Sequence, residues 1–418
     1  MAGLRRRVVV TGLGAVTPLG IGVRPTWEGL LRGQSGVGLI SLYDHSKHEV
    51  HIAGEVKNWA PEQFMEKKAA RHMDRFSQLA VAAASEAFSD SKLDFAKEDT
   101  ARIGVVMGTG IGGITTIEEQ KEILMARGPS RVTPFLIPRL MGNAAAGHIS
   151  IMHKLRGPNF CVVTACAAGS NSLGSALRLI QYGEADVMLA GGTEAAITPL
   201  GMAGFANMGA LSKRSGPPQA VSRPFDQERD GFVMGEGAGA LVLEELQHAL
   251  QRDARIYAEF SGYGLSGDGH HITAPCEDGD GGIRCMALAL ADAGLQPPDI
   301  DYINAHGTST PFNDRVETLA IKKVFGERAA KLAVNSTKSM TGHTLGAAGG
   351  VEAVVAVLSV VEDQVHPTIN LTHADPHCDL DYVTEGTRKM KVRAVLSNSL
   401  GFGGHNATLC FTKFTLHR

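Results

Sequence analysis

The chain of 418 residues has only six cysteines, and no two of them form a C-x-x-C pair. Their wide spacing argues against a disulfide framework and a zinc site, and it predicts a reducing compartment. No G-x-S-x-G segment is present, which disfavours a serine hydrolase. Neither sign of charge dominates, because the chain has 40 Lys and Arg residues and 43 Asp and Glu residues, which give a formal net charge of -3. No nucleic-acid partner is therefore expected.

Long hydrophobic runs are also missing. The first strand is expected at Val8–Val10, and no apolar h-region or cleavage site surrounds it, so we predict no secretory signal. The most apolar stretch, Val351–Val361, is much shorter than a membrane span and contains Glu352, which predicts a buried helix. We expect a bacterial cytoplasmic protein, with the mitochondrial or plastid matrix after removal of a transit peptide as the alternative.

The composition that remains is that of a large α/β protein. Hydrophobic residues make up 44% of the chain, and 50 glycines suit many tight turns between strands and helices. Short Val/Ile/Leu runs alternate with longer Ala/Leu/Glu patterns, which is typical of parallel strands covered by helices. Strands are predicted at 103–107, 187–190 and 240–243, and helices at 76–89 and 283–293. The length exceeds one ordinary core, so two domains or a duplicated fold are expected.

Cys166 is a candidate nucleophile because of its position between two different patterns. The β-branched run Val162-Val163-Thr164 stops just before it, and small residues follow it into a helical pattern. A helix beginning at Cys166 would direct unpaired N–H groups and the positive end of its dipole at the sulfur, which predicts a lowered thiol pKa. Buried free cysteine usually acts as a small hydrophobe, so this segment alone supports both interpretations equally.

Two distant histidines strengthen the catalytic interpretation. His306 and His343 each lie in a polar, glycine-containing segment that directly follows an apolar run. Catalytic groups collect on loops at strand ends of α/β proteins, so these positions favour a role in the site. A strand, a polar loop and a helix occur at Cys166 and again at His306, which is a hint of internal duplication.

Two other motifs have weaker support. Gly108–Gly113 satisfies G-x-G-x-x-G after a predicted strand, but no acidic residue after a second strand completes a dinucleotide-binding unit. His45, His48 and His51 have ligand-like spacing, yet their segment is charged and lacks a fourth donor, so a metal site is disfavoured there.

Taken together, these segments resemble the elongating β-ketoacyl-[acyl-carrier-protein] synthases, the KAS I and KAS II condensing enzymes, and they are most similar to KAS II. The similarity runs from Arg7–Gly14 through Arg223–Asp226 and Arg229–Gly237 to Gly401–Asn406. The resemblance implies a thiolase-like α/β fold, with two duplicated βαβαβαββ halves in five α-β-α-β-α layers. Residues 1–255 would carry the nucleophile and residues 256–418 the two histidines. His405 departs from the pattern, since many members have Thr there.

The resemblance implies a 3-oxoacyl-[acyl-carrier-protein] synthase, an acyltransferase that adds two carbons to a fatty acyl chain. Cys166 would hold the acyl group while His306 and His343 donate hydrogen bonds to a thioester oxygen. The backbone N–H groups of Cys166 and Phe402 would form the oxyanion hole, and Gly401 and Gly403 would let the Phe402 loop move as a gate. No organic cofactor is implied. The implied partners are an acyl carrier protein with its acyl and malonyl phosphopantetheine thioesters and a second copy of the chain in a homodimer.

Further residues carry roles implied by the same resemblance. Lys338 and Glu352 would pair and fix His343. The phosphopantetheine arm would meet the hydroxyls of Thr308 and Thr310, and the acyl pocket would be lined by Ile111 and Phe205. A structural Na⁺ or K⁺ ion would lie near Asn304, Glu317, Glu352, Ser397 and Asn398, although these residues also suit purely polar packing.

Docking of the acidic carrier protein requires a local basic patch, because the chain is slightly acidic overall. The candidate cations are Lys67, Lys68, Arg71, Arg75, Lys213 and Arg214. The first four recur at spacings of three and four residues, which predicts one helical face. An ordinary solvated helix surface fits this spacing equally well.

Two other protein classes remain as alternatives. They are a polyketide-type ketosynthase and a thiolase-fold acyltransferase that uses coenzyme A substrates. A thiolase would need a second active cysteine near the C-terminus, but Cys410 lies in the apolar run Ala407–Phe411 and is predicted to be in a buried strand. An initiating KAS III-type enzyme would carry Cys, His and Asn, whereas His343 supplies a second histidine here. A chain-length factor would lack the nucleophile.

Overall fold

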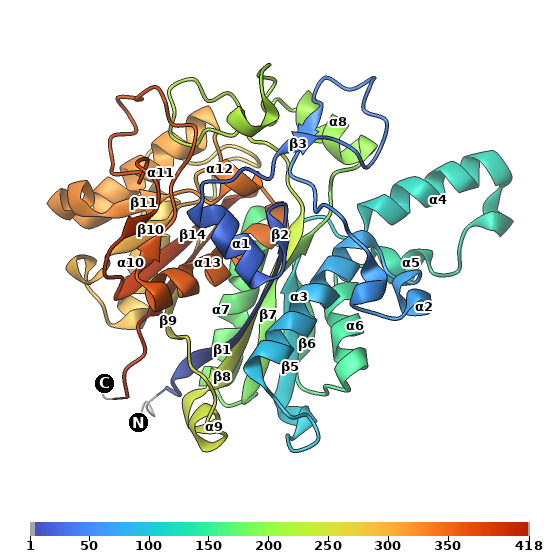
Figure 1. The fold of residues 1–418 in the computed structure, drawn as a ribbon, viewed down its shortest axis with the longest axis horizontal. Coiled ribbons are helices and arrows are strands. Elements are labelled where there is room, and N and C mark those ends of the chain that lie inside the picture. Colours follow the sequence, from blue (N-terminus) through green and yellow to red (C-terminus); the bar gives the residue numbers. More distant parts are fainter. Residues whose placement is uncertain (1–4, 417–418) are drawn as a thin grey trace.

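The computed structural model describes residues 5–416 of the chain (Figure 1). Residues 1–4 and 417–418 lie outside the described residues. The prediction that no secretory signal precedes the first strand concerns residues 1–4 in part, and that part lies outside the described residues. The main strands form one sheet in the order β11-β10-β14-β15-β9-β1-β8-β7-β5-β6, and the short β2 (Gly20–Ile21) pairs with β1.

The first half of this sheet has the order β6-β5-β7-β8-β1. Its strands are β1 (Val8–Thr17), β5 (Ile103–Gly108), β6 (Asn159–Val162), β7 (Val187–Glu194) and β8 (Gly237–Glu245). The three strands β6, β5 and β7 are parallel, whereas β8 is antiparallel to both β7 and β1.

The second half repeats this arrangement as β11-β10-β14-β15-β9. Its strands are β9 (Ala258–Gly267), β10 (Tyr302–Asn304), β11 (Ala333–Asn335), β14 (Ala394–Gly401) and β15 (His405–Thr412). Again the first three are parallel, and β15 is antiparallel to both of its neighbours. The two halves meet where Val9 and Val10 of β1 pair with Glu259 and Ala258 of β9. The predicted duplication is therefore confirmed.

Helices complete five layers around the two halves. In the middle layer, α7 (Ala168–Gln181) and α13 (Ala348–Glu362) pack against each other and against strands of both halves. The outer face of the first half is covered by α3 (Arg75–Ser91) and α6 (Ala144–His153). The outer face of the second half is covered by α10 (Asp280–Ala293) and α11 (Pro311–Phe325) (Figure 1).

The helix α13 confirms the prediction of a buried apolar helix, but it is longer than the predicted segment. Residues Leu345–Glu362 are apolar enough, with a mean hydropathy of 1.7, to cross a membrane by length and composition alone. However, 89% of this stretch is buried inside the protein, where α13 contacts β7, β8 and β14. It is thus the core helix between the two halves.

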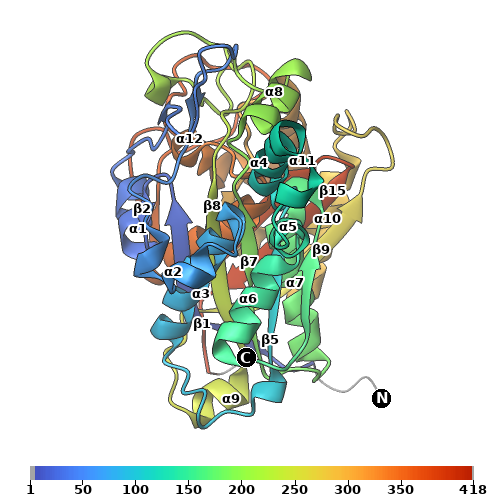
Figure 2. The ribbon, with the colours of Figure 1, turned by 90° about the vertical axis from the view of Figure 1, so that its right-hand side faces the viewer.

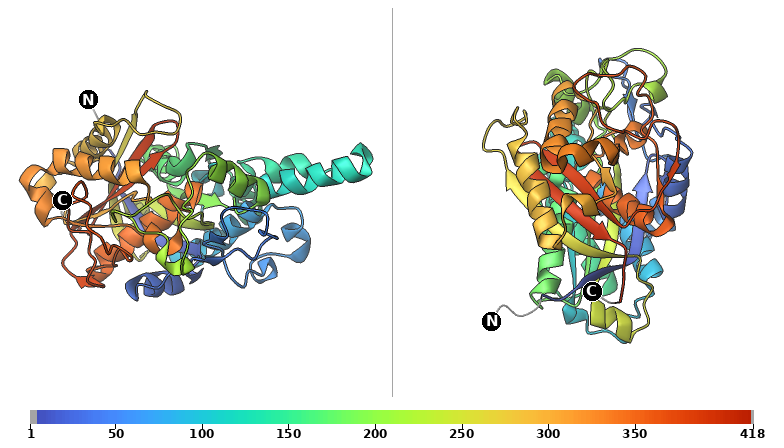
Figure 3. Two further views of the ribbon diagram at one scale, coloured as in Figure 1. Left: turned by 90° about the horizontal axis from the view of Figure 1, so that it is seen from above. Right: turned by 90° about the vertical axis from the view of Figure 1, so that its left-hand side faces the viewer.

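Smaller elements form the periphery. The helix α4 (Ile114–Arg127) forms an arm that stands away from the body (Figures 1 and 3), and the short α5 (Leu136–Leu140) lies at the base of this arm, where it contacts α6. The pair β3 (Gly38–Leu39) and β4 (Ile52–Ala53), α8 (Pro199–Asn207) and α12 (Lys338–Thr341) lie toward one end of the molecule (Figure 2). The others are α1 (Val23–Leu31), α2 (Lys67–Ala70), α9 (Leu246–Gln251), β12 (Gln364–Val365) and β13 (Arg388–Lys389).

Several apolar side chains of α4 and of the segment that follows it are exposed, including Ile117, Met125, Phe135 and Ile137. Exposed apolar side chains are typical of an interface between proteins where they form a contiguous patch. The homodimer stays a prediction.

The predicted strands and helices are all present, with ends that differ by a few residues. The predicted equivalence between the Cys166 and His306 segments is wrong, however. Since β10 occupies the position of β5, the segment after β10 that carries His306 is equivalent to the loop after β5. The counterpart of β6, Cys166 and α7 is the segment β11, His343 and α13. Cys166 and His343 therefore precede two equivalent helices that pack against each other.

Candidate active site

Cys166 is held in a tight turn between β6 and α7. Ala165 has a left-handed backbone with a φ of 48°, and a 3₁₀ turn from Ala165 to Ala167 leads into α7 at Ala168. The predicted helix start at Cys166 is thus displaced by two residues. A Cβ atom at Gly401 would lie 2.9 Å from the Thr164 carbonyl oxygen and 3.2 Å from the Cys166 nitrogen, so a glycine is needed there. The turn brings the sulfur close to the β14–β15 loop.

The lowered thiol pKa predicted from the helix terminus is wrong. Burial raises the pKa of Cys166 to about 12, because a buried thiolate loses its hydration. The positive charge of Lys338 and the backbone N–H groups of Phe402 and Cys166 act in the opposite direction, whereas Glu194 raises the pKa further. Both N–H groups predicted to form the oxyanion hole therefore lie at the sulfur.

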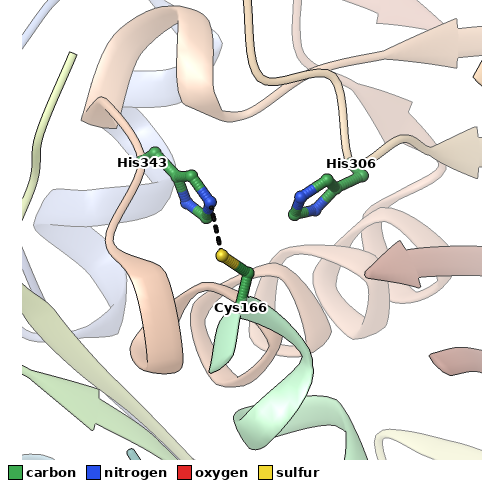
Figure 4. A group of neighbouring side chains, drawn as sticks. All are labelled: Cys166, His306 and His343. Atoms are coloured by element: carbon green, nitrogen blue, oxygen red, sulfur yellow. Dashed lines mark hydrogen bonds between the residues drawn. The ribbon is translucent and has the colours of Figure 1, made fainter. Parts of the chain in front are cut away.

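The two histidines approach this sulfur from separate loops of the second half (Figure 4). His343 Nε2 lies 3.1 Å from Cys166 Sγ, and His343 Nδ1 accepts a hydrogen bond from the Leu345 backbone N–H at 3.2 Å. A neutral imidazole carries one proton, so an accepting Nδ1 assigns that proton to Nε2. His343 is therefore a hydrogen-bond donor to the sulfur.

His306 lies across from His343, with 5.2 Å between ring centroids and an interplanar angle of 85°. Its buried Nδ1 has no hydrogen-bond partner within residues 5–416. Burial lowers the pKa of both imidazoles well below the usual range, and the charge of Lys338 lowers them further. Both rings are consequently neutral at pH 7 and able to donate a hydrogen bond.

Lys338 and Glu352 form a buried ion pair in which each side chain is only 2% exposed. Burial raises the pKa of Glu352 to about 7, and the ammonium of Lys338 opposes that rise. Lys338 begins α12, and its carbonyl accepts the N–H of Gly342, the residue before His343, at 3.1 Å. Lys338 thus acts on the site both through its charge and through the backbone that carries His343.

Cys166, His306 and His343 line one cavity of about 350 Å³. Of the predicted substrate-binding residues, those that also line it are Phe205, Thr308, Thr310, Gly401 and Phe402. The Thr308 and Thr310 hydroxyls are 2.9 Å apart, within hydrogen-bond distance of each other. Ile111 and Gly403 are not among the lining residues, and Ile111 is exposed at the base of the arm.

Phe232 is a residue of the site that the sequence reasoning missed. Its ring lies edge-on to His343 at 5.1 Å and to Phe205 at 5.7 Å, and it lines the cavity. The signal was present, because Phe232 lies inside the segment Arg229–Gly237 that carries the family resemblance.

The residues predicted to hold a monovalent cation have the oxygen atoms that such an ion needs. Asn304 Oδ1, Glu352 Oε2 and Ser397 Oγ are buried without hydrogen-bond partners among the described residues, and Asn304 and Ser397 are register partners in β10 and β14. Hard oxygen donors with nearby carboxylates fit Na⁺ or K⁺. Glu317 differs, since its carboxylate accepts the backbone N–H groups of His306 and Gly307 at 2.8 Å each.

The remaining predicted ligand, Asn398, is also engaged with protein atoms. Its amide donates to Glu317 at 3.2 Å and accepts from Thr408 at 2.9 Å. Glu317 and Asn398 thus support the His306 loop, and the cation itself stays a prediction.

The predicted docking helix does not exist as one element. The helix α2 ends at Ala70, and Asp74 caps the start of a new helix, α3. Arg75 belongs to that second helix and forms a bidentate pair with the fully buried Glu236 at 2.6 and 2.7 Å, so its assignment to an exposed patch is wrong. Lys67, Lys68 and Arg71 are exposed.

The other two docking candidates are already paired. Lys213 lies 2.7 Å from Glu49, and Arg214 forms an ion pair with Glu228. Both follow Gly209 and Ala210, which line the cavity. They are therefore near the cavity mouth, but their charge is partly neutralised.

Two family models match the chain. The β-ketoacyl synthase N-terminal domain matches residues 5–249, and the β-ketoacyl synthase C-terminal domain matches residues 257–372. The chain belongs to the β-ketoacyl synthase family. The match to both models confirms the family expected from the sequence motifs.

Individual relatives show which members of the family this β-ketoacyl synthase resembles. It is 54% identical over 410 residues to 3-oxoacyl-[acyl-carrier-protein] synthase 2 of Synechocystis sp., covering 98% of this chain and 99% of that protein. It is 51% identical over 409 residues to the protein of the same name from Staphylococcus aureus, with the same coverage. The resemblance to the KAS II type is thereby confirmed.

A solved structure supports the fold of this β-ketoacyl synthase. The structure is that of a type II polyketide synthase acyl-carrier protein in complex with its ketosynthase, bound to the hexaketide. One chain of it superposes on this chain with a TM-score of 0.91 at 37% identity. The match covers 98% of this chain and 100% of that chain.

Proposed function

We propose that this β-ketoacyl synthase is a 3-oxoacyl-[acyl-carrier-protein] synthase that elongates fatty acids by condensing malonyl-carrier protein with an acyl group on Cys166. The observation that carries the proposal is the cysteine flanked by two neutral histidines, with His343 donating to its sulfur. Fatty acyl substrates are favoured over polyketides, because identity is 54% to the synthase 2 relative and 37% to the polyketide ketosynthase.

In the first stage, the Cys166 sulfur attacks the thioester carbonyl of the acyl-carrier protein. A new S–C bond forms, the carrier thiol leaves, and the proton of Cys166 ends on that leaving sulfur. The oxyanion that forms in between meets the N–H groups of Cys166 and Phe402, which are already directed at the sulfur. The His343 Nε2–H stabilises the thiolate as it develops.

In the second stage, malonyl-carrier protein loses CO₂ and leaves an enolate. The neutral rings of His306 and His343 donate hydrogen bonds to the enolate oxygen, since an acylated sulfur no longer accepts from His343. The enolate carbon then attacks the acyl carbonyl, a C–C bond forms, and the Cys166 thiolate leaves. It takes up one proton from solvent, which replaces the proton that the first stage gave to the carrier thiol. The charge of Lys338 favours each anionic intermediate by proximity to the sulfur.

Incubation of the protein with acyl-carrier proteins of several chain lengths tests this function. Intact mass is expected to increase by one acyl group on Cys166, and malonyl-carrier protein is expected to convert that species into free enzyme and a 3-oxoacyl product. A mass increase with acyl-coenzyme A but none with any acyl-carrier protein would contradict the proposal. It would favour the coenzyme A acyltransferase instead.

Docking of the carrier protein is proposed on the exposed cations Lys67, Lys68 and Arg71. Within residues 5–416 none of the three takes part in a salt bridge, so each is available to an acidic partner. Exposed charges act mainly on the rate of association and are screened over a Debye length of about 8 Å at physiological salt.

The double variant Lys68→Glu/Arg71→Glu is therefore expected to raise the KM for malonyl-carrier protein about tenfold and to flatten its salt dependence. The rate with malonyl-coenzyme A should change little. Lys97→Glu is a matched control, because Lys97 is an exposed lysine on another loop that pairs with Asp94. Equal losses with both substrates would show that the patch supports folding, and no loss would place the docking surface elsewhere.

A further inference from the structure

The glycine-rich segment Gly108–Gly113 encloses an anion that belongs to the protein itself. Glu194, the last residue of β7, is fully buried. Its carboxylate accepts hydrogen bonds from the Thr109 hydroxyl and the Gly110 N–H, both at 2.7 Å. The next two backbone N–H groups of the loop donate at 3.2 and 3.3 Å. Consecutive N–H groups that converge on one point form an anion-binding nest, which explains why the loop resembles a phosphate-binding motif.

The same carboxylate reaches the histidine side of the site. The backbone N–H of Gly346 donates to Glu194 Oε2 at 3.1 Å. Gly346 follows Leu345, whose N–H holds His343 Nδ1 and so assigns the proton of that ring. A Cβ atom at Gly346 would lie 2.4 Å from the Gly110 nitrogen and 2.8 Å from Glu194 Oε2. The two loops are therefore in direct contact around one carboxylate.

The charge of Glu194 has no cationic partner within 4 Å among residues 5–416. Burial raises the pKa of this carboxyl above its usual value, and the hydrogen-bond donors of the two loops oppose that rise. The charged and titratable groups that face Cys166 are Lys338 from α12, Glu194 from β7 and the neutral rings of His306 and His343. A Cβ atom at Gly110 would lie 2.9 Å from Glu194 Oε2 and 3.5 Å from the Cα atom of Ala165, so the carboxylate lies beside the turn that carries Cys166. Lys338 lowers the pKa of the Cys166 thiol, and Glu194 raises it. Two opposite charges thus act on the sulfur.

We propose that Glu194 is a positioning residue for the condensation: it holds the Gly108–Gly113 loop and the His343 turn in one register, and its charge acts on the Cys166 sulfur. Ile111, predicted to line the acyl pocket, donates its backbone N–H to Glu194. An acyl chain that displaces this loop would therefore also displace the turn that carries His343, because both are bonded to the same carboxylate. The expected effect of the acyl chain on the His343 turn rests on the function proposed above, whereas the effect of the Glu194 charge on the Cys166 sulfur does not.

The variant Glu194→Gln tests the electrostatic part without any carrier protein. Removing the negative charge is expected to move the pH midpoint of Cys166 alkylation by iodoacetamide to lower pH and to increase the alkylation rate at a fixed pH about threefold to tenfold. Glu86→Gln is the matched control. Glu86 is a largely buried carboxylate that also accepts two backbone N–H groups, from Ala15 and Val23, but it lies on the outer helix α3. A midpoint in Glu194→Gln equal to that of wild type would overturn the proposal.

The positioning part is tested by condensation kinetics. In Glu194→Gln an amide N–H faces the N–H donors of the loops, so kcat is expected to fall at least about tenfold, with a larger loss for long than for short acyl chains. Glu86→Gln should lose thermal stability without this dependence on chain length. If both variants lose kcat equally, the proposal is overturned.

Should Glu194→Gln fail to fold, Thr109→Val keeps the charge and removes one of its hydrogen bonds. It is expected to lower kcat severalfold at an unchanged alkylation midpoint, and a wild-type kcat would overturn the proposal. If the wild-type protein does not condense malonyl-carrier protein at all, the function proposed above fails, while the alkylation experiment still decides the role of Glu194.

Discussion

Cys166→Ala is expected to abolish both acyl transfer and condensation, because no other described sulfur lies against the two histidines. A loss of at least about 10⁴-fold in kcat is expected when the covalent intermediate cannot form. Intact mass after incubation with acyl-carrier protein measures the first step, and product formation measures the second. Cys161→Ala is the matched control, since Cys161 lies five residues earlier on β6 and burial raises its pKa to about 11. Acylation that persists in Cys166→Ala would refute the assignment of the nucleophile.

Cys166→Gln separates the two stages of the reaction. Its side-chain amide imitates the acylated cysteine, so the neutral His306 and His343 should remain poised to bind the malonyl thioester oxygen. Decarboxylation of malonyl-carrier protein is therefore expected to stay at the wild-type rate or to rise. Release of labelled CO₂ is the measurement. The division of labour is wrong if Cys166→Gln releases as little CO₂ as the double variant His306→Ala/His343→Ala.

His306→Ala is expected to form the acyl-enzyme and then fail to condense. His343 Nε2 lies 3.1 Å from the Cys166 sulfur in the resting site, whereas the buried Nδ1 of His306 has no hydrogen-bond partner among the described residues. The loss in condensation is expected to be roughly 10²-fold to 10³-fold, as for removal of one donor to a developing oxyanion. Mass spectrometry of the acylated protein and a product assay distinguish the two stages.

His366→Ala provides the control for this variant. His366 is also a fully buried histidine, and burial lowers its pKa to about 4, but it bonds to Thr337 outside the cavity. The His366→Ala variant should have a lower thermal stability, but the fraction that remains folded should still carry out condensation. Complete loss of acylation in His306→Ala would instead assign His306 to activation of the thiol.

Local patterns were sufficient wherever the relevant interaction is local. The Val/Ile/Leu runs became β5, β7 and β8, and the apolar stretch around Val351 became the core helix α13, because period and composition report burial directly. The prediction of one continuous docking helix was wrong, because it also relied on a local pattern but needed a feature that the pattern does not report. A spacing of three and four residues indicates one face only if the helix is continuous, and the cap at Asp74 interrupts it before Arg75.

The sequence by itself determined the family, and it singled out Cys166, His306 and His343 as the candidate catalytic residues, since both depend on residue types in ordered motifs. Only the tertiary structure decided how they act. The Cys166 pKa depends on burial and on Lys338 and Glu194, which are distant in the chain. The donor role of His343 depends on a hydrogen bond from Leu345, whose position is set by the contact between two loops at Glu194. Desolvation and hydrogen-bond geometry arise only when the two halves pack together, so no local pattern of residues can encode them.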